Sequence, residues 1–318
     1  MTYAVGSTIQ ATDFNNFAGG STANISGQIN SVWSTGNGNS GYGQTAVANV
    51  SVGANVSATS WASMVNAINN ARLHQSGSGS GITAPAAGTK INYLSTLSSS
   101  ITSCYTSRLS NNTVGSLISG STYTASATAA TNVDYPETTL GAYRYVTFSS
   151  GDAARYFFNA GGQIIYQVTN VTNNNGTARS ASARTLLLTN FAGISGFKGY
   201  SNSGRLGTGG TVARNSTGFG YWNLSQIGGS PGWQWIVDIQ STTASYTTDY
   251  MRFYAALNSS TNVSGHGDNG NIVAFALNLS SPAHVWDAAL DITVSYRIDI
   301  YPPESTYLTN SWGTPVVS

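Results

Sequence analysis

Histidine, cysteine and acidic side chains are few in this chain and dispersed along it. The three histidines, His74, His266 and His284, lie far apart in the sequence, and none belongs to an HExxH zinc motif. His266 and Asp268 could supply two ligands to a metal ion, but a metal site needs at least one further ligand, and a polar turn accounts for the pair more simply. The single cysteine, Cys104, can form neither a disulfide within the chain nor a thiolate zinc cluster. We therefore expect no metal and no cofactor.

Two glycine triplets match the GxGxxG pattern of nucleotide-binding loops. They are Gly36, Gly38 and Gly41, and Gly265, Gly267 and Gly270. In a chain with 36 glycines such matches arise by chance, and neither triplet lies between a predicted parallel strand and a helix. The sequence has no GKS or GKT phosphate loop. The glycine-rich stretches 35–43 and 76–81 are interpreted instead as flexible linkers or as places where backbones approach closely in an assembled interface.

One pair of carboxylates could serve a glycoside hydrolase, which uses two such groups about 5–10 Å apart. Asp238 and Asp249 are the candidates because tyrosines and tryptophans, on which sugars stack, surround them in the sequence. Their simpler interpretation is as solvated side chains on the wet faces of strands. An enzyme that degrades surface polysaccharide is therefore the third of our hypotheses, and we expect a protein that is not an enzyme.

Aromatic side chains form a dense cluster in the second half of the chain. Alternation along strands should point about half of them into the core. The others are expected at an interface with a neighbouring chain, where tyrosine and tryptophan are enriched, or on a platform that contacts glycans. The cluster spans 34 residues and comprises Tyr221, Trp222, Trp233, Trp235, Tyr246, Tyr250 and Tyr254.

The composition limits the classes of partner. The 318 residues are 40% hydrophobic and 11% aromatic but only 7% charged, against roughly 25% charged in an average globular chain. The hydrophobic share is sufficient for a folded core. A net charge of +1 gives no field that attracts nucleic acid or an anionic membrane, so we expect neither as a partner. No apolar run approaches the roughly 18 residues of a membrane span, and the N-terminus lacks the features of a secretory signal.

Charge placement divides the chain into two regions. Between Asp13 and Asp134 there is no acidic residue, and the only charges there are those of Arg72, Lys90 and Arg108. Helical periodicity precedes this boundary and alternation typical of strands follows it, so we place the boundary near 120–134, in a low-complexity run. The predicted domains are a helical docking or oligomerisation module at 1–125 and a β-sandwich domain at 126–318.

Three helices are predicted in the first region. The first begins at 12–13, where Thr and Asp are good N-caps, and its apolar residues continue to Trp33, although a glycine pair in between can break it. The second begins at 59–60, and the third runs from Thr89 to the stop at Asn111. The second helix has a face with the i, i+3, i+4, i+7 spacing of buried residues, formed by Trp61, Met64, Val65, Ile68 and Ala71.

Strands are predicted in the second region from alternation of apolar and polar residues. The clearest runs from 290 to 300 and is ended by Pro302, which donates no ladder hydrogen bond. Further strands are predicted at 233–240, 250–257, 273–279, 143–148 and 164–168. One face of the strand at 233–240 should carry Trp233, Trp235, Val237 and Ile239. Such strands with Gly/Asn turns predict an antiparallel, jelly-roll-like β-sandwich, and with the helices an α+β fold.

Five strings stand out as motifs. They are residues 13–16 (DFNN), 36–44 (GNGNSGYGQ), Trp61 with 70–75 (NARLHQ), 155–164 (RYFFNAGGQI) and 311–313 (SWG). Together they resemble segments of virion structural proteins from tailed bacteriophages of aquatic bacteria. The resemblance implies membership of a virus particle, as a component of a tail, baseplate, fibre or neck. It carries no catalytic residues over to this chain.

The resemblance implies a non-enzymatic structural component of a bacteriophage virion that assembles in the host cytoplasm, and the composition agrees with a protein that packs against copies of itself. Expected partners are copies of the chain itself, with a trimer favoured, and other virion proteins. Few charges suit such packing, because a charge buried at an interface costs several kcal/mol unless it is paired. The alternatives are a carbohydrate-binding receptor-recognition domain of a phage fibre, with a host surface glycan as partner, and a capsid decoration protein.

Overall fold

The computed structural model describes residues 9–20, 25–34, 36–89, 91, 93–136, 140–227, 232–258, 270–282 and 288–318. The chain divides into two compact units, each assembled from segments that are distant in the sequence. The first unit consists of 1–116, 152–162 and 302–313. The second unit consists of 117–151, 163–301 and 314–318.

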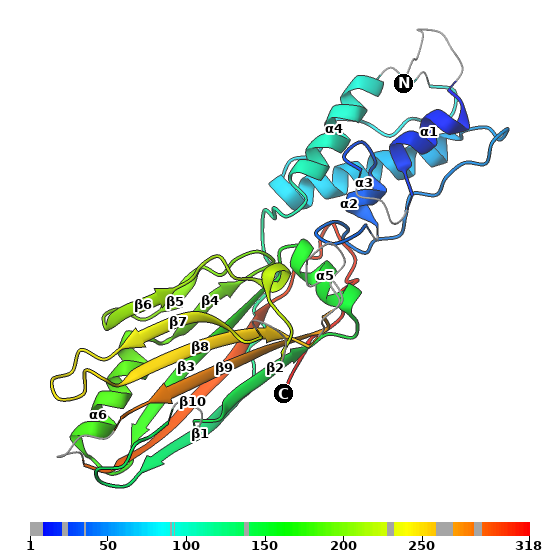
Figure 1. The fold of residues 1–318 in the computed structure, drawn as a ribbon. Helices are drawn as coiled ribbons and strands as arrows, with labels where there is room; N and C mark the ends of the chain where they lie inside the picture. Colours follow the sequence, from blue (N-terminus) through cyan, green and yellow to red (C-terminus); the bar gives the residue numbers. More distant parts are fainter. Residues whose placement is uncertain are drawn as a thin grey trace. The chain divides into compact units, whose positions relative to one another are not determined.

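The first unit contains helices and long irregular connections (Figure 1). Its helices are α1 (Ala11–Ala18), α2 (Asn30–Trp33), α3 (Ala58–Ser76), α4 (Leu94–Thr106) and α5 (Gly151–Asn159), of which α5 belongs to this unit from Asp152 onwards. Within the described ranges, no helix has the length and apolar character needed to cross a membrane.

Helix α3 forms the centre of the first unit. The Ser57 side chain caps it by accepting a hydrogen bond from the Ser60 amide at 3.1 Å, and Gly77 ends it in the left-handed conformation at φ 71°. The predicted apolar face is confirmed, since all five of its residues are buried. The Phe14 and Trp61 rings meet edge to face at 5.2 Å, which fastens α1 to α3.

The other two helix predictions need correction. The predicted first helix is interrupted, because α1 ends at Ala18 and α2 begins only at Asn30. Gly19 has φ 76°, and the Gln28 side chain lies 2.4 Å from where a Cβ on Gly19 would be, so the backbone turns there as only glycine allows. The third helix begins at Leu94 rather than Thr89 and ends at Thr106, since Thr89 instead bonds back to the Ala86 carbonyl in a turn.

The second unit contains two antiparallel sheets, so the chain as a whole is α+β. One sheet has the strand order β1-β10-β3-β4-β5 and the other β11-β2-β9-β8-β7-β6. The strands, drawn in Figure 1, are β1 (Thr122–Ala129), β2 (Ala142–Thr147), β3 (Gln163–Asn173), β4 (Gly193–Phe197), β5 (Gly204–Leu206), β6 (Thr211–Asn215), β7 (Gln234–Gln240), β8 (Tyr250–Leu257), β9 (Ile272–Ser280), β10 (Leu290–Tyr301) and β11 (Val316–Val317).

The buried faces of the two sheets contact each other through aromatic rings. The Tyr166 ring on β3 lies 4.8 Å from the Phe253 ring on β8 and 5.6 Å from the Tyr296 ring on β10. Phe197 on β4 meets Phe275 on β9 edge to face at 5.3 Å. Edge-to-face and offset pairs of this kind contribute beyond the area they bury, so these rings form the core of the second unit.

Several elements have no counterpart in the sequence-based prediction. The low-complexity run assigned to the domain boundary contains β1, which pairs with β10 along its whole length. Helix α6 (Ala178–Thr185) leads into a short π-helix, η2 (Leu186–Asn190), and the Thr177 side chain caps α6 by accepting from the Ser180 amide. Strand β1 alternates threonine or serine with tyrosine or alanine, and this pattern is weak because three of its four less polar positions are alanine.

Candidate functional site

The strings that carry the resemblance come together inside the first unit, apart from Gln163 and Ile164, which belong to the second. Arg155 on α5 donates a hydrogen bond from Nη1 to the Ser40 carbonyl at 2.6 Å. The Asn159 side-chain amide, one turn further along α5, donates to the carbonyls of Gly41 at 3.1 Å and Gly38 at 3.3 Å. The loop 36–43 thus directs its carbonyl oxygens at a guanidinium. A phosphate-binding loop does the reverse, since it presents amide N–H groups to an anion.

The end of this loop is joined to the C-terminal string. Gln44 donates to the Thr309 carbonyl at 3.0 Å and accepts from the Thr309 amide at 2.8 Å. The Ser311 hydroxyl donates to the Tyr42 carbonyl at 2.6 Å. Gly43 between them has φ 69°, and a Cβ there would lie 2.4 Å from the Tyr156 ring. These motif residues therefore bond to one another and hold distant segments of the first unit together.

His74, from another of the strings, is buried in the same region. Its Nε2 lies 3.1 Å from the Ala160 carbonyl, so the neutral ring donates there. Burial lowers the pKa of His74 below its ordinary 6.5, although the Ala160 hydrogen bond opposes that shift.

We expect His74 to make the first unit less stable in acid. As the pH falls below about 6.5, the unfolded chain binds a proton that the folded chain resists, so the free energy of unfolding decreases. Denaturant titrations at about pH 7.5 and about pH 5 should show that the free energy of unfolding falls more in the native chain than in His74→Gln. Equal losses in the two proteins would contradict this assignment.

The remaining catalytic candidates do not assemble into a site within the described ranges. His266, Asp268 and His284 lie outside those ranges, as does most of the second glycine triplet. Burial raises the pKa of the Cys104 thiol to about 12, which keeps it protonated. Among the described residues there is no group of three His, Cys, Asp or Glu side chains that could hold a metal ion.

The two candidate carboxylates occupy different environments. Asp238 on β7 pairs with Arg252 on β8, with Oδ2 and Nε 3.3 Å apart. Asp249 directly precedes β8, and its side chain is fully buried. A fully buried carboxylate faces no open cleft, so this geometry does not bring the two acids together around a solvent-accessible substrate.

The aromatic cluster divides into a buried and a half-buried set. Four of its members are buried: Tyr221, Trp222, Tyr246 and Tyr254. The Tyr221 hydroxyl, for example, donates to the Gly270 carbonyl at 2.9 Å. The half-buried members are Trp233, Trp235 and Tyr250, which reach the surface along β7 and β8.

A β-bulge in β7 corrects the prediction that Trp235 shares a face with Val237 and Ile239. Trp235 lies opposite Tyr254 and Val237 lies opposite Phe253, so Ile236 is an extra residue on β7. One extra residue reverses the alternation beyond it. Val237 and Ile239 therefore point into the core, and Trp235 points to the outer face of the sheet.

On this outer face, arginines stack on the half-buried aromatic rings. The Arg252 guanidinium lies 4.2 Å from the Trp235 ring centroid and 4.3 Å from that of Tyr250. The Arg214 guanidinium on β6 lies 4.9 Å from Trp235. Such cation–π contacts contribute about 0.5–1 kcal/mol each at exposed sites. Sequence reasoning identified the aromatic residues but missed both arginines. For Arg252 the available signal was its position between Tyr250 and Tyr254 on one face of β8, whereas Arg214, on β6, gave no such signal.

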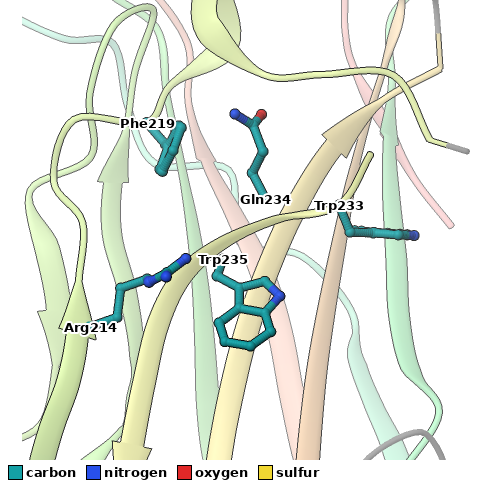
Figure 2. Close-up of a pocket in the computed structure, with 5 residues that line it drawn as sticks. All are labelled: Arg214, Phe219, Trp233, Gln234 and Trp235. Carbon is teal, nitrogen blue, oxygen red and sulfur yellow. The ribbon is translucent and has the colours of Figure 1, made fainter. Parts of the chain in front are cut away.

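A hollow of about 350 Å³ opens beside Arg214 and Trp235. Figure 2 shows Arg214 and Phe219 on one side, Trp233 on the other, and Trp235 and Gln234 between them. We call these five residues the aromatic–arginine hollow. Its combination of flat apolar rings with one cation is chemically suited to a small ligand that has an apolar face and an acidic group.

Comparisons with protein-family models, with curated proteins and with solved structures give no match for this chain.

Proposed function

We propose that the chain is a non-enzymatic structural component of a bacteriophage virion that assembles through interfaces between subunits. A tail, baseplate, fibre or neck position is the one implied by the resemblance. The role of the motif residues supports a structural function, because Arg155, Asn159 and Gln44 are committed to hydrogen bonds that hold the first unit together.

The observation that carries the proposal is an uncharged, exposed sheet edge. Strand β1 lies at the end of its sheet and has eight residues without a single charge. Natural monomers protect such edges with charges, prolines or short strands. Leu117 and Ile118, which precede β1, are 43% and 44% exposed, and Val316 on β11 is 62% exposed. We infer that this flank packs against another copy of the chain, with other virion proteins as further partners.

The strand order supports a finer description of the second unit as a jelly-roll-like β-sandwich. Strands β1 and β3 flank β10 in one sheet, while β2 neighbours β9 in the other. The chain therefore alternates between the sheets at both ends of the unit, as it does in a jelly roll. The successive strands β6 to β9 instead form a meander within one sheet.

A lysine on the edge strand should weaken the assembly. Thr124 is exposed in the middle of β1, so Thr124→Lys would place a charge in the inferred interface. We expect the subunit dissociation constant to rise at least about tenfold, as measured by sedimentation equilibrium. Thr242→Lys, on an exposed residue between β7 and β8, is the matched control and should leave association unchanged. Unchanged association of a folded Thr124→Lys protein would rule out this edge as the interface.

The aromatic–arginine hollow favours a second role, binding of a saccharide as in a receptor-recognition domain. Sugar rings present C–H groups that pack on aromatic faces, and Trp233 and Trp235 are half-buried tryptophans beside an open hollow. Binding of saccharides to the purified chain tests this role, and it is compatible with a structural position in the particle.

A further inference from the structure

The aromatic–arginine hollow exists because β6 is shorter than its neighbour. Strand β6 ends at Asn215, which lies opposite Val237, and the Ser216 amide makes one more bond to the Ile236 carbonyl at 2.7 Å. Beyond that point no strand in the described sheet covers this edge of β7 at 233–235. The chain leads instead to Phe219, which closes one side of the hollow.

The wall formed by Gln234 is held in place by its own hydrogen bonds. Its Oε1 accepts from the Ser225 amide at 2.6 Å, and its Nε2 donates to the Asn223 carbonyl at 3.1 Å. These two bonds fix the side chain to the loop after β6. The hollow is therefore largely formed before any ligand arrives, which lowers the entropic cost of binding.

The charges around the hollow leave one cation available. The Arg252 guanidinium is paired with the Asp238 carboxylate, whose side chain is only 13% exposed. Arg214 is exposed, and the described residues include no acidic side chain that forms an ion pair with it. Arg214, Arg252 and Asp238 together carry a net charge of one positive unit, which matches a ligand with a single negative charge.

We propose that the aromatic–arginine hollow binds a saccharide ring that carries a carboxylate. The apolar face of the ring would pack on Trp233 or Phe219, and the carboxylate would accept hydrogen bonds from the Arg214 fork, whose geometry matches it. A volume of about 350 Å³ lies in the range of small-ligand sites. This proposal rests on the saccharide-binding role and names its ligand class. Uronic acids and sialic acids both have a carboxylate attached to a sugar ring.

Calorimetric titration of the full chain tests the proposal with matched probes. Trigalacturonic acid is compared with its carboxyl-reduced trimer, and sialyllactose with lactose. We expect at least one acidic probe to bind about tenfold more tightly than its neutral counterpart. The pair that gives this preference identifies the source of the carboxylate. Adenosine monophosphate is included because a nucleobase also stacks on aromatic rings.

Variants assign the binding to the hollow. Arg214→Gln should abolish the preference for the acidic probe, whereas Arg72→Gln in the first unit should retain it. Trp233→Ala should weaken the binding of acidic and neutral probes by similar factors. Equal binding of acidic and neutral probes, or a preference that survives Arg214→Gln, would overturn the proposal and leave saccharide binding standing. Absence of all saccharide binding, or tighter binding of adenosine monophosphate, would overturn both.

Discussion

Replacing Arg155 by alanine is expected to lower the free energy of unfolding of the first unit by about 3 kcal/mol. The Arg155 guanidinium is buried and donates to the Ser40 carbonyl, and its removal leaves that acceptor without its charged partner. The loop 36–43 would lose its main attachment to α5. Denaturant titration measures the total loss, and amide hydrogen exchange in α3 and α5 locates it in the first unit.

Two control variants separate the contributions of Arg155. Its ion-pair partner Asp152 is 64% exposed, so Asp152→Ala should cost less than about 1 kcal/mol. Arg155→Lys retains the charge but loses the planar guanidinium. Its loss of unfolding free energy should lie between those of Asp152→Ala and Arg155→Ala. If Asp152→Ala were as destabilising as Arg155→Ala, the ion pair rather than the loop carbonyls would be the source of the stability.

Tyr166→Ala is expected to destabilise the second unit by about 3–5 kcal/mol, the cost of removing a large buried aromatic ring. The Tyr166 ring is fully buried and touches rings from both sheets, so its loss opens a cavity between them. The measurement is denaturant titration, with hydrogen exchange in β8 and β10 to locate the change.

Tyr166→Phe is the matched control for this cavity. The Tyr166 hydroxyl has no hydrogen-bond partner among the described residues, and burial raises the pKa of Tyr166 well above 10.0. Removing the hydroxyl should therefore change the free energy of unfolding by less than about 1 kcal/mol. A large loss in Tyr166→Phe would mean that the hydroxyl, rather than the packing of the ring, is the important group.

Local patterns were sufficient to predict the regular elements with strong periodicity. Helix α3 was predicted within two residues of its start, and strands β8, β9 and β10 were predicted with the correct buried faces. In each of these, the residues that bury the element repeat at the period of the element itself. In strand β1 the alternation is between threonine or serine and mostly alanine, which is a weaker pattern, and the strand pairs with β10 along its whole length.

The candidate site was only partly predictable because its geometry depends on one inserted residue and on contacts distant in sequence. Alternation alone places Trp235 on the same face as Val237 and Ile239, and the bulge at Ile236 puts it on the opposite face. Arg214 comes from a different strand, so no spacing in the sequence relates it to Trp235. Similarly, the motif at 36–44 gave no indication that its partners are Arg155 and Thr309.

The mass of the purified native chain in solution tests the central proposal most directly. Light scattering after size exclusion, at micromolar concentration, should give the mass of two or more chains of 33.0 kDa each, with three copies as the favoured number. Incubation with particles that lack the protein should then incorporate it. A stable 33.0 kDa monomer that fails to join particles would contradict the proposal that this protein functions through contacts between subunits.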